Sequence, residues 1–133
     1  MIQRNNQILI VDDEEFLCEA MQTHLERRGY LVFVANSAKE AVAIIKEANP
    51  NLILLDKIMP ELNGIEALRL IRGFNSYIKV IMLSAEELDN QTKDQLHRLN
   101  LFAYIRKSTN TVELDSILDK ALKSEGINEE ENN

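Results

Sequence analysis

Charged and polar side chains follow four short apolar runs of this sequence. Asp12 and Asp13 follow residues 8–11, Asp56 follows 52–55, Ser84 follows 80–83, and Lys107 follows 102–106. Two carboxylates about 5 Å apart repel by roughly 3 kcal/mol at an effective dielectric constant near 20, so a group of three needs a cation or a proton. Mg²⁺ meets that need, because it binds one or two carboxylates and takes waters and phosphate oxygens as further ligands. If the runs converge, these residues predict a phosphoryl-transfer site.

The remaining side chains fit the same chemistry. A carboxylate held beside a metal ion can attack phosphorus and form an aspartyl phosphate. Lys107 would neutralise one phosphoryl oxygen from the other side of the crevice, and Ser84 would donate a hydrogen bond to another. A single aspartate at a strand end is often only a helix cap, and a lysine after a strand is usually solvated, so the prediction rests on their joint occurrence.

Strand and helix patterns alternate along the chain, which predicts a parallel sheet covered by helices on both faces. The carboxyl ends of such strands share one edge of the sheet, where ligands of open α/β folds bind. The predicted strands span residues 7–11, 31–35, 51–56, 78–83 and 101–106. The predicted helices span residues 14–28, 37–48, 64–73, 86–99 and 110–124.

Apolar stripes predict which side of each helix faces the sheet. In the first helix the stripe consists of Phe16, Leu17, Ala20, Met21 and Leu25. In the fifth helix it consists of Leu114, Ile117, Leu118, Ala121 and Leu122. The fourth helix has a stripe of only Leu88, Leu96 and Leu99. We therefore expect the fourth helix to be held least firmly. Capping boxes, Ser37 with Glu40 and Asn110 with Glu113, predict the starts of the second and fifth helices.

Bulk properties exclude several classes of protein. A chain of 133 residues, with 45% hydrophobic and 28% charged residues, is expected to form one globular domain. No apolar stretch approaches the roughly 20 residues that span a bilayer, and no apolar signal core precedes the first strand, so we expect a cytoplasmic location. Cys18 is the single cysteine and is expected to be a packing residue rather than a nucleophile.

The net charge of −7 argues against direct binding of DNA or RNA, because proteins that bind nucleic acids present a basic patch. Much of the acidic excess follows Lys123, in Glu125, Glu129, Glu130 and Glu131. We expect residues 1–124 to form the domain and residues 125–133 to form an acidic, disordered tail.

From about residue 7 to residue 123, the sequence closely resembles the receiver domain of two-component response regulators. Four motifs carry the resemblance, in this order: Ile-Val-Asp-Asp-Glu ending at Glu14, Leu-Leu-Asp-Lys-Ile-Met-Pro ending at Pro60 with Asn63-Gly64, Leu-Ser-Ala ending at Ala85, and Tyr-Ile-Arg-Lys ending at Lys107. The resemblance implies a flavodoxin-like, doubly wound α/β fold, with five helices and five parallel strands in the order 2-1-3-4-5.

The same resemblance implies roles for the acidic residues. Asp56 would be the phosphoacceptor, which takes a phosphoryl group from a histidine on a partner sensor kinase or phosphotransfer protein. Asp13 would bind Mg²⁺ directly and Asp12 would bind it through water. Asp56 and the backbone carbonyl of Ile58 would complete the protein ligands.

The resemblance also assigns the residues around the phosphoryl group. Ser84 and Lys107 would bind it, and Ser84 with Tyr104 would form the switch that alters the partner surface. Two positions depart from the family's usual pattern. Ser108 stands where the family generally has a proline in a cis peptide bond, a geometry that costs about 3 to 4 kcal/mol for another residue. Ile58, near the path of attacking water, cannot orient that water. Glu86 faces the same approach in the family, where its carboxylate would either repel an incoming nucleophile or position water.

Three classes of function remain open. The favoured one is a phosphorylation-dependent binding module, a stand-alone regulator like the chemotaxis regulator or a phosphorelay intermediate, which acts on an output protein and is not a turnover enzyme. A second is the N-terminal receiver of a longer regulator, with residues 125–133 starting a linker. A third is a phosphatase with an aspartate nucleophile. Those enzymes have a strand that ends in Asp-x-Asp, whereas this sequence has Ile58 at the position of the second aspartate.

Overall fold

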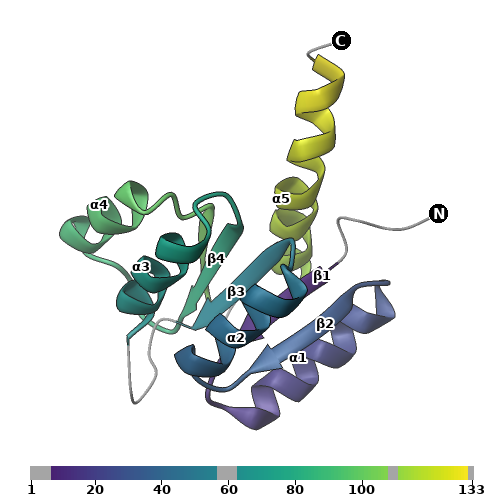
Figure 1. The fold of residues 1–133 in the computed structure, drawn as a ribbon, viewed down its shortest axis with the longest axis horizontal. Helices are drawn as coiled ribbons and strands as arrows, with labels where there is room; N and C mark the ends of the chain where they lie inside the picture. The colour runs from purple at the N-terminus through teal and green to yellow at the C-terminus, as the bar shows by residue number, and fades with distance from the viewer. Residues whose placement is uncertain (1–6, 57–62, 108–110, 132–133) are drawn as a thin grey trace.

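Parallel strands form a single sheet at the centre of the molecule. The computed structural model describes residues 7–56, 63–107 and 111–131, with side chains described as far as Leu122. The strands are β1 (Gln7–Val11), β2 (Leu31–Ala35), β3 (Leu52–Asp56), β4 (Lys79–Ser84) and β5 (Ala103–Arg106). Their order across the sheet is β2-β1-β3-β4-β5, and Figure 1 labels the first four strands of this order. The predicted strand order is confirmed, and it places β1 and β3 side by side.

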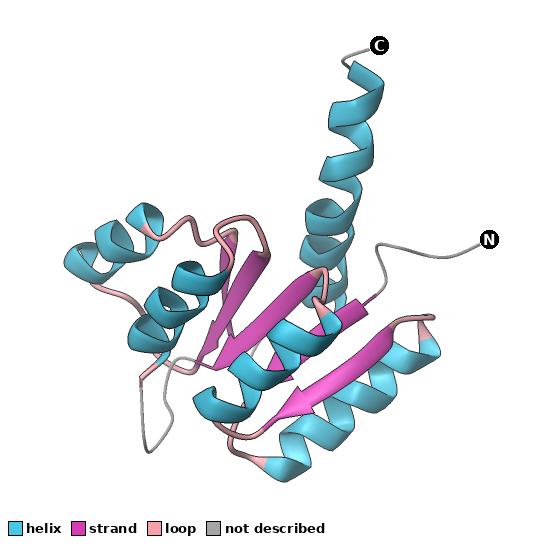
Figure 2. Cartoon of the chain, in the orientation of Figure 1, coloured by secondary structure: helices cyan, strands magenta, loops and turns pink. Residues whose placement is uncertain are grey.

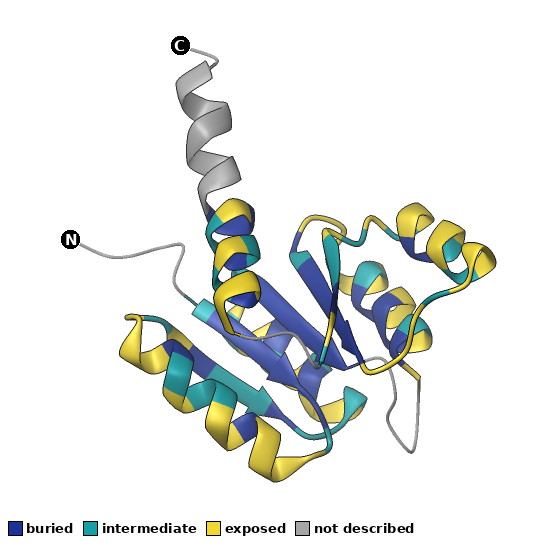
Figure 3. Cartoon of the chain, turned by 180° about the vertical axis from the view of Figure 1, so that it is seen from behind, coloured by how far each residue is buried: buried dark blue, intermediate teal, exposed yellow. Residues whose placement is uncertain are grey.

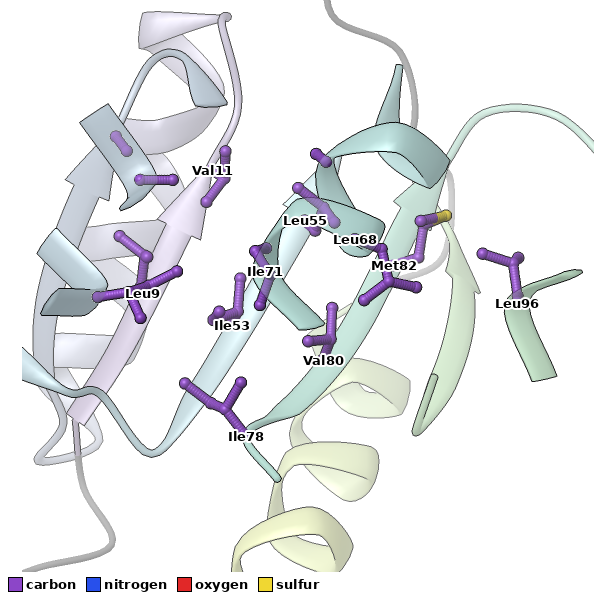
Figure 4. Packing of buried hydrophobic residues seen from close by; sticks show 14 residues of the cluster. Leu9, Val11, Ile53, Leu55, Leu68, Ile71, Ile78, Val80, Met82 and Leu96 are labelled. Atoms are coloured by element: carbon purple, nitrogen blue, oxygen red, sulfur yellow. The ribbon is translucent and has the colours of Figure 1, made fainter. Parts of the chain in front are cut away.

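Helices cover both faces of this sheet (Figure 2). They are α1 (Glu15–Arg27), α2 (Ala38–Ala48), α3 (Gly64–Phe74), α4 (Asn90–Arg98) and α5 (Thr111–Glu131). On one face, α2, α3 and α4 pack over alternate strand residues such as Leu9, Ile53 and Val80 (Figure 4). On the other face, α1 and α5 pack over the intervening residues, such as Ile8 and Leu52. The fold is therefore the doubly wound α/β architecture that the strand and helix alternation predicts.

The central strands are buried on both faces, as their continuous apolar runs require. All residues of β3 are buried, and so are all residues of β1 after Gln7. Figure 3 shows these strands in dark blue between helices whose outer sides are exposed. None of the described helices combines the length and the apolar character needed to cross a bilayer.

The apolar stripe expected for α1 is partly wrong. Phe16 is 88% exposed and Leu17 is 41% exposed, and Ala20 is exposed as well. The helix instead buries Cys18 and Leu25 against the sheet, with Met21 partly buried between them. Phe16 precedes Cys18 by two residues, which at 3.6 residues per turn places it on nearly the opposite side of the helix.

The stripe expected for α5 is confirmed, because its apolar residues are buried or partly buried in the core on that face of the sheet. The helix itself is longer than predicted and runs to Glu131 rather than ending at residue 124. The division of the chain into a domain of residues 1–124 and a tail of residues 125–133 stays a prediction.

The fourth helix begins later than predicted. α4 starts at Asn90 rather than at residue 86, because the side chain of Asp89 accepts a hydrogen bond from the backbone N–H of Thr92 and caps the helix. Within α4, all of which is described, Leu96 is the one buried residue. Leu88 and Leu99 pack against the same core from the segments that flank the helix. The helix has little apolar anchorage, as its composition indicates.

Candidate functional site

The two acidic motifs meet at the carboxyl edge of the sheet. The register aligns Val11 with Leu55, so Asp12 and Asp56 are the next residues of two adjacent strands. One carboxylate oxygen from each of Asp12, Asp13 and Asp56 lies within 4.8 Å of the others. Asp12 and Asp56 are both only 4% exposed, and Asp13 is more open to solvent. Three oxygens so close together, two of them shielded from water, fit a hard divalent cation.

Lys107 supplies positive charge to this cluster. Its ammonium lies 3.1 Å from Oδ1 of Asp56, 3.4 Å from Oδ2 of Asp12 and 3.4 Å from Oε1 of Glu14. Burial favours the neutral amine, but the hydrogen bonds to Asp56 and Asp12 and their negative charges outweigh it and raise the pKa of Lys107. The side chain therefore carries its charge at neutral pH.

Ser84 lies next to the phosphoacceptor candidate in the sheet. β3 and β4 pair with Asp56 opposite Leu83, so Ser84 comes one position beyond, at the same edge. It is fully buried, and its hydroxyl oxygen accepts a hydrogen bond from the backbone N–H of Glu86 at 3.1 Å. Its carbonyl accepts from the backbone N–H of Lys107 at 2.8 Å. The backbone of Ser84 therefore ties Lys107 to this part of the site.

Tyr104 is the second residue of β5, away from the carboxyl edge of the sheet, and is partly buried. Its hydroxyl is shielded from solvent and, among the described residues, has no hydrogen-bond partner. The ring borders a cavity of about 530 Å³ whose other walls include Leu88, Lys93, Leu96 and His97. A buried phenol without a partner is unusual, because leaving a buried polar group unsatisfied costs about 1 to 3 kcal/mol. Because Lys93, Leu96 and His97 belong to α4, the cavity beside Tyr104 adjoins the helix with little apolar anchorage.

Sequence reasoning missed two residues that contact the acidic pair. Asn36, which directly follows β2, donates from Nδ2 to the backbone carbonyl of Asp12 at 3.0 Å. Glu14 contacts Lys107 through its carboxylate and donates its backbone N–H to Oδ1 of Asp12 at 3.0 Å. The position of Asn36 at the carboxyl end of a predicted strand was the available signal, since that edge carries every other residue of the site.

Cys18 behaves as the sequence indicates. It is buried, and its thiol donates a weak hydrogen bond to the Asp12 carbonyl, with Sγ 3.4 Å from the oxygen. Burial, together with the negative charge of Asp12, raises the pKa of the thiol to about 11. A thiol that stays protonated at neutral pH is a poor nucleophile. Cys18 is thus a packing residue.

Ile58 and Ser108, which bear on the metal ligands and on the reach of Lys107, lie outside the described residues.

Comparisons with known proteins agree with this geometry. The family model described as "Response regulator receiver domain" matches residues 8–119. The alkaline phosphatase synthesis transcriptional regulatory protein PhoP of Bacillus subtilis is 39% identical over 83 residues, a match that covers 62% of this chain and 35% of that protein. The uncharacterized transcriptional regulatory protein YkoG of Bacillus subtilis is 33% identical over 126 residues, covering 93% of this chain and 54% of that protein.

A solved structure supports the same fold. The receiver domain of the Francisella response regulator 1452 superposes with a TM-score of 0.80 at 28% identity, and the match covers 90% of this chain and 98% of that one. The two curated relatives are longer, and the matched region spans 35% and 54% of their lengths. The functions of the unmatched parts of those two proteins are not assigned to this chain.

Proposed function

Because the chain belongs to the response regulator receiver domain family, we propose that Asp56 accepts a phosphoryl group from a phosphorylated histidine of a partner protein. The strongest support is the setting of its carboxylate, which is buried at the sheet edge with the ammonium of Lys107 3.1 Å away. A sensor histidine kinase or a histidine phosphotransfer protein would supply the group. An oxygen of Asp56 forms the new bond to phosphorus while the bond from phosphorus to the histidine nitrogen breaks.

Asp12, Asp13 and Asp56 would hold Mg²⁺, with Asp13 as a direct ligand, Asp12 acting through water and the backbone carbonyl of Ile58 as a further ligand. The cluster of three carboxylate oxygens within 4.8 Å supports this assignment, since Mg²⁺ prefers hard oxygen ligands. When bound, Mg²⁺ neutralises charge on the phosphoryl oxygens. The contribution of the chain is to hold the carboxylates together despite their repulsion.

Lys107 and Ser84 would bind the phosphoryl group once it is on Asp56. Lys107 already contacts the Asp56 carboxylate, so its ammonium can move to a phosphoryl oxygen over a short path. The Ser84 hydroxyl accepts a hydrogen bond from Glu86 and also carries a proton that it can donate to a second oxygen. The transfer occurs once for each phosphoryl group, with slow hydrolysis afterwards, so the domain acts as a phosphoacceptor and not as a turnover enzyme.

Ser84 and Tyr104 would transmit the change to a protein-binding surface at α4, β5 and α5. A phosphoryl group on Asp56 offers new acceptor oxygens, which would draw the Ser84 hydroxyl inward. An inward turn of Tyr104 is not needed for this, because its hydroxyl is already shielded from solvent here. The response would therefore be a movement of α4 over the cavity beside Tyr104. An output protein that recognises this face would sense the phosphorylated state.

The test of the phosphoacceptor is an intact-mass measurement. The purified protein, incubated with Mg²⁺ and a small phosphodonor such as acetyl phosphate, should gain the mass of one phosphoryl group. The gain should disappear when EDTA replaces Mg²⁺ and in the variant Asp56→Asn, which keeps the size of the side chain. An undiminished adduct in Asp56→Asn would refute the assignment of Asp56.

Amide hydrogen exchange tests the switch separately. Beryllofluoride with Mg²⁺ mimics a phosphoryl group on a carboxylate, so its addition should change exchange in residues 86–106 as well as around Asp13 and Asp56. Changes confined to the neighbourhood of Asp13 and Asp56 would leave the phosphoacceptor role intact and remove the proposed role of this face.

A second arrangement is favoured by the length of the relatives. The matched regions span about a third and about half of the two curated transcriptional regulators. The chain would then be the receiver of a longer regulator, and the phosphorylated face would act on an attached output domain. Reading the codons that follow residue 133 in the genome separates the two arrangements.

A further inference from the structure

The backbone of Asp12 is held at both of its polar groups by neighbouring elements. Its N–H donates to the carbonyl of Ala35, the last residue of β2, at 3.1 Å. Its carbonyl accepts from Nδ2 of Asn36 at 3.0 Å and from Sγ of Cys18 at 3.4 Å. The Asn36 contact is the stronger of the two, because an amide N–H is a better donor than a thiol.

The Asp12 carbonyl has a particular importance for the acidic pair. It belongs to the peptide unit that joins Asp12 to Asp13, and a peptide unit is planar, so a hydrogen bond to its oxygen restricts the orientation of the whole unit. The orientation of that unit sets the direction in which the backbone leaves Asp12 and hence where Asp13 begins. A contact to this oxygen therefore acts on the relative placement of the two carboxylates without touching either of them.

Asn36 is itself held in place. Its backbone N–H donates to Oε1 of Glu40 at 2.8 Å, and the next residue, Ser37, caps α2 by accepting from the backbone N–H of Glu40 at 3.1 Å. The capping interaction predicted for Ser37 and Glu40 thus extends to Asn36. The hydrogen bond from the Asn36 backbone to the Glu40 carboxylate does not involve the Ser37 hydroxyl, and it fixes the residue whose amide contacts the Asp12 carbonyl, which lowers the entropy cost of that contact.

We propose that Asn36 is a positioning residue of the metal site, which holds the peptide unit between Asp12 and Asp13 so that the two carboxylates are oriented for a divalent cation before it binds. This inference rests on the proposed function in that the cation is Mg²⁺. Three carboxylates that repel one another tend to spread apart in the metal-free protein. The Asn36 contact opposes that spreading, so its removal reduces affinity for the cation. Cys18 assists with a weaker hydrogen bond to the same oxygen.

Magnesium binding to the unphosphorylated protein tests the proposal by calorimetric titration, without any phosphodonor. Asn36→Ala and Asn36→Leu should each weaken Mg²⁺ binding by about three- to tenfold, the range expected for losing one hydrogen bond that orients a ligand. Asn36→Leu preserves approximately the size of the side chain, so agreement between the two variants assigns the effect to the lost donor.

The matched control is Ser37→Ala, which removes the cap of α2 one residue away and leaves the Asp12 contact in place. It should lower the thermal unfolding midpoint and leave the Mg²⁺ dissociation constant within twofold of the wild-type value. A purely structural role of Asn36 would give this same pattern in Asn36→Ala. A dissociation constant of Asn36→Ala within twofold of the wild-type value would therefore overturn the proposal.

A second readout does not involve metal. The backbone N–H of Glu14 donates to the Asp12 carboxylate, so it reports on the order of the acidic loop. Its amide exchange in the metal-free protein should be faster in Asn36→Ala and unchanged in Ser37→Ala. Wild-type protein that binds no Mg²⁺ would overturn both this inference and the metal part of the proposed function. Normal binding by both wild type and Asn36→Ala would overturn only the inference.

Discussion

The ammonium of Lys107 lies 3.1 Å from the carboxylate of Asp56, although Lys107 follows β5, Asp56 ends β3, and β4 lies between these two strands. The contact forms because β5 ends at the same edge of the sheet as β3 and because the backbone N–H of Lys107 donates to the carbonyl of Ser84. The lysine thus occupies, with its charge, the region where a metal ion and a phosphoryl group would also lie. It stabilises the cluster in the absence of metal and would compete with a metal ion for the same oxygens.

Replacing Lys107 by methionine should therefore strengthen Mg²⁺ binding to the unphosphorylated protein, by about tenfold for removal of one charge roughly 5 Å from a divalent ion in water. The same variant should accept a phosphoryl group more slowly, because one source of positive charge at the phosphoryl oxygens is lost. Calorimetry measures the first effect and intact mass against time measures the second. Weaker Mg²⁺ binding in Lys107→Met would contradict the competition.

Loss of Asp13 should weaken Mg²⁺ binding more than loss of Asp12. A direct ligand contributes more than one that acts through water, so we expect Asp13→Ala to lose roughly tenfold or more in affinity, about 1.4 kcal/mol. Asp12→Ala should lose less affinity and more stability, because Asp12 is buried and accepts from the backbone N–H of Glu14. Titrations and urea unfolding of both variants decide this. Equal losses of affinity would mean that the two carboxylates share the ion symmetrically.

The aspartyl phosphate should be comparatively long-lived. Ile58, which lies outside the described residues, offers attacking water no hydrogen bond. Ile58→Asn supplies a polar group at that position and should shorten the lifetime of the phosphoryl group, measured as the decay of the adduct mass after the donor is removed. A slower or unchanged decay would disprove the shielding argument and make Glu86 the residue to examine.

Arg72 should be the strongest single anchor at the C-terminal end of α4. Its guanidinium donates to backbone carbonyls that precede β4, those of Asn75 and Ile78, and to carbonyls that follow α4, those of Leu99 and Asn100. Burial lowers the pKa of Arg72, whose guanidinium remains a cationic donor at neutral pH. Arg72→Met leaves these carbonyls without their donor and should lower the free energy of unfolding by about 1 to 3 kcal/mol.

Urea unfolding of Arg72→Met measures that loss. The control is Arg69→Met, because Arg69 lies on the exposed side of α3, the helix that also contains Arg72. The control should change stability by less than about 0.5 kcal/mol, as surface substitutions usually do. Amide exchange at residues 99–102 should rise in Arg72→Met. A loss of stability no larger than that of the control would show that solvent replaces the arginine without cost.

Cys18 should resist thiol reagents at neutral pH. Its folded pKa of about 11 exceeds the ordinary value of 9.0, so at pH 8 the folded thiol is ionised about a hundredfold less than in the unfolded chain. The colour reaction with Ellman's reagent should be slower than in urea-unfolded protein by about that factor or more. Since the raised pKa favours the protonated form in the folded state, its contribution to stability is present below pH 9 and is lost as the pH rises toward 11. Rapid labelling of folded protein at pH 8 would mean that the thiol is open to solvent.

Local patterns determined most of the strands. The runs at 7–11 and 31–35 have the observed bounds of β1 and β2, because four or five consecutive apolar residues between polar turns have few alternatives to a strand buried on both faces. The positions of the acidic residues at strand ends also follow from short-range spacing, which the sequence displays directly. The strand order was implied only by the resemblance of the motifs to the receiver-domain family, because spacing along the chain does not determine which strands are neighbours.

Tertiary contacts decided the features in which neighbouring elements compete. Phe16 lies on nearly the opposite side of α1 from Cys18 and Leu25, and only packing of the helix against the sheet selects the side that excludes Phe16. The hydrogen bond from Asn36 to Asp12 joins residues 24 positions apart, and that from Lys107 to Asp56 joins residues farther apart still. Sequence spacing encodes local geometry along one element, whereas the distance between two elements depends on how all of the intervening chain packs.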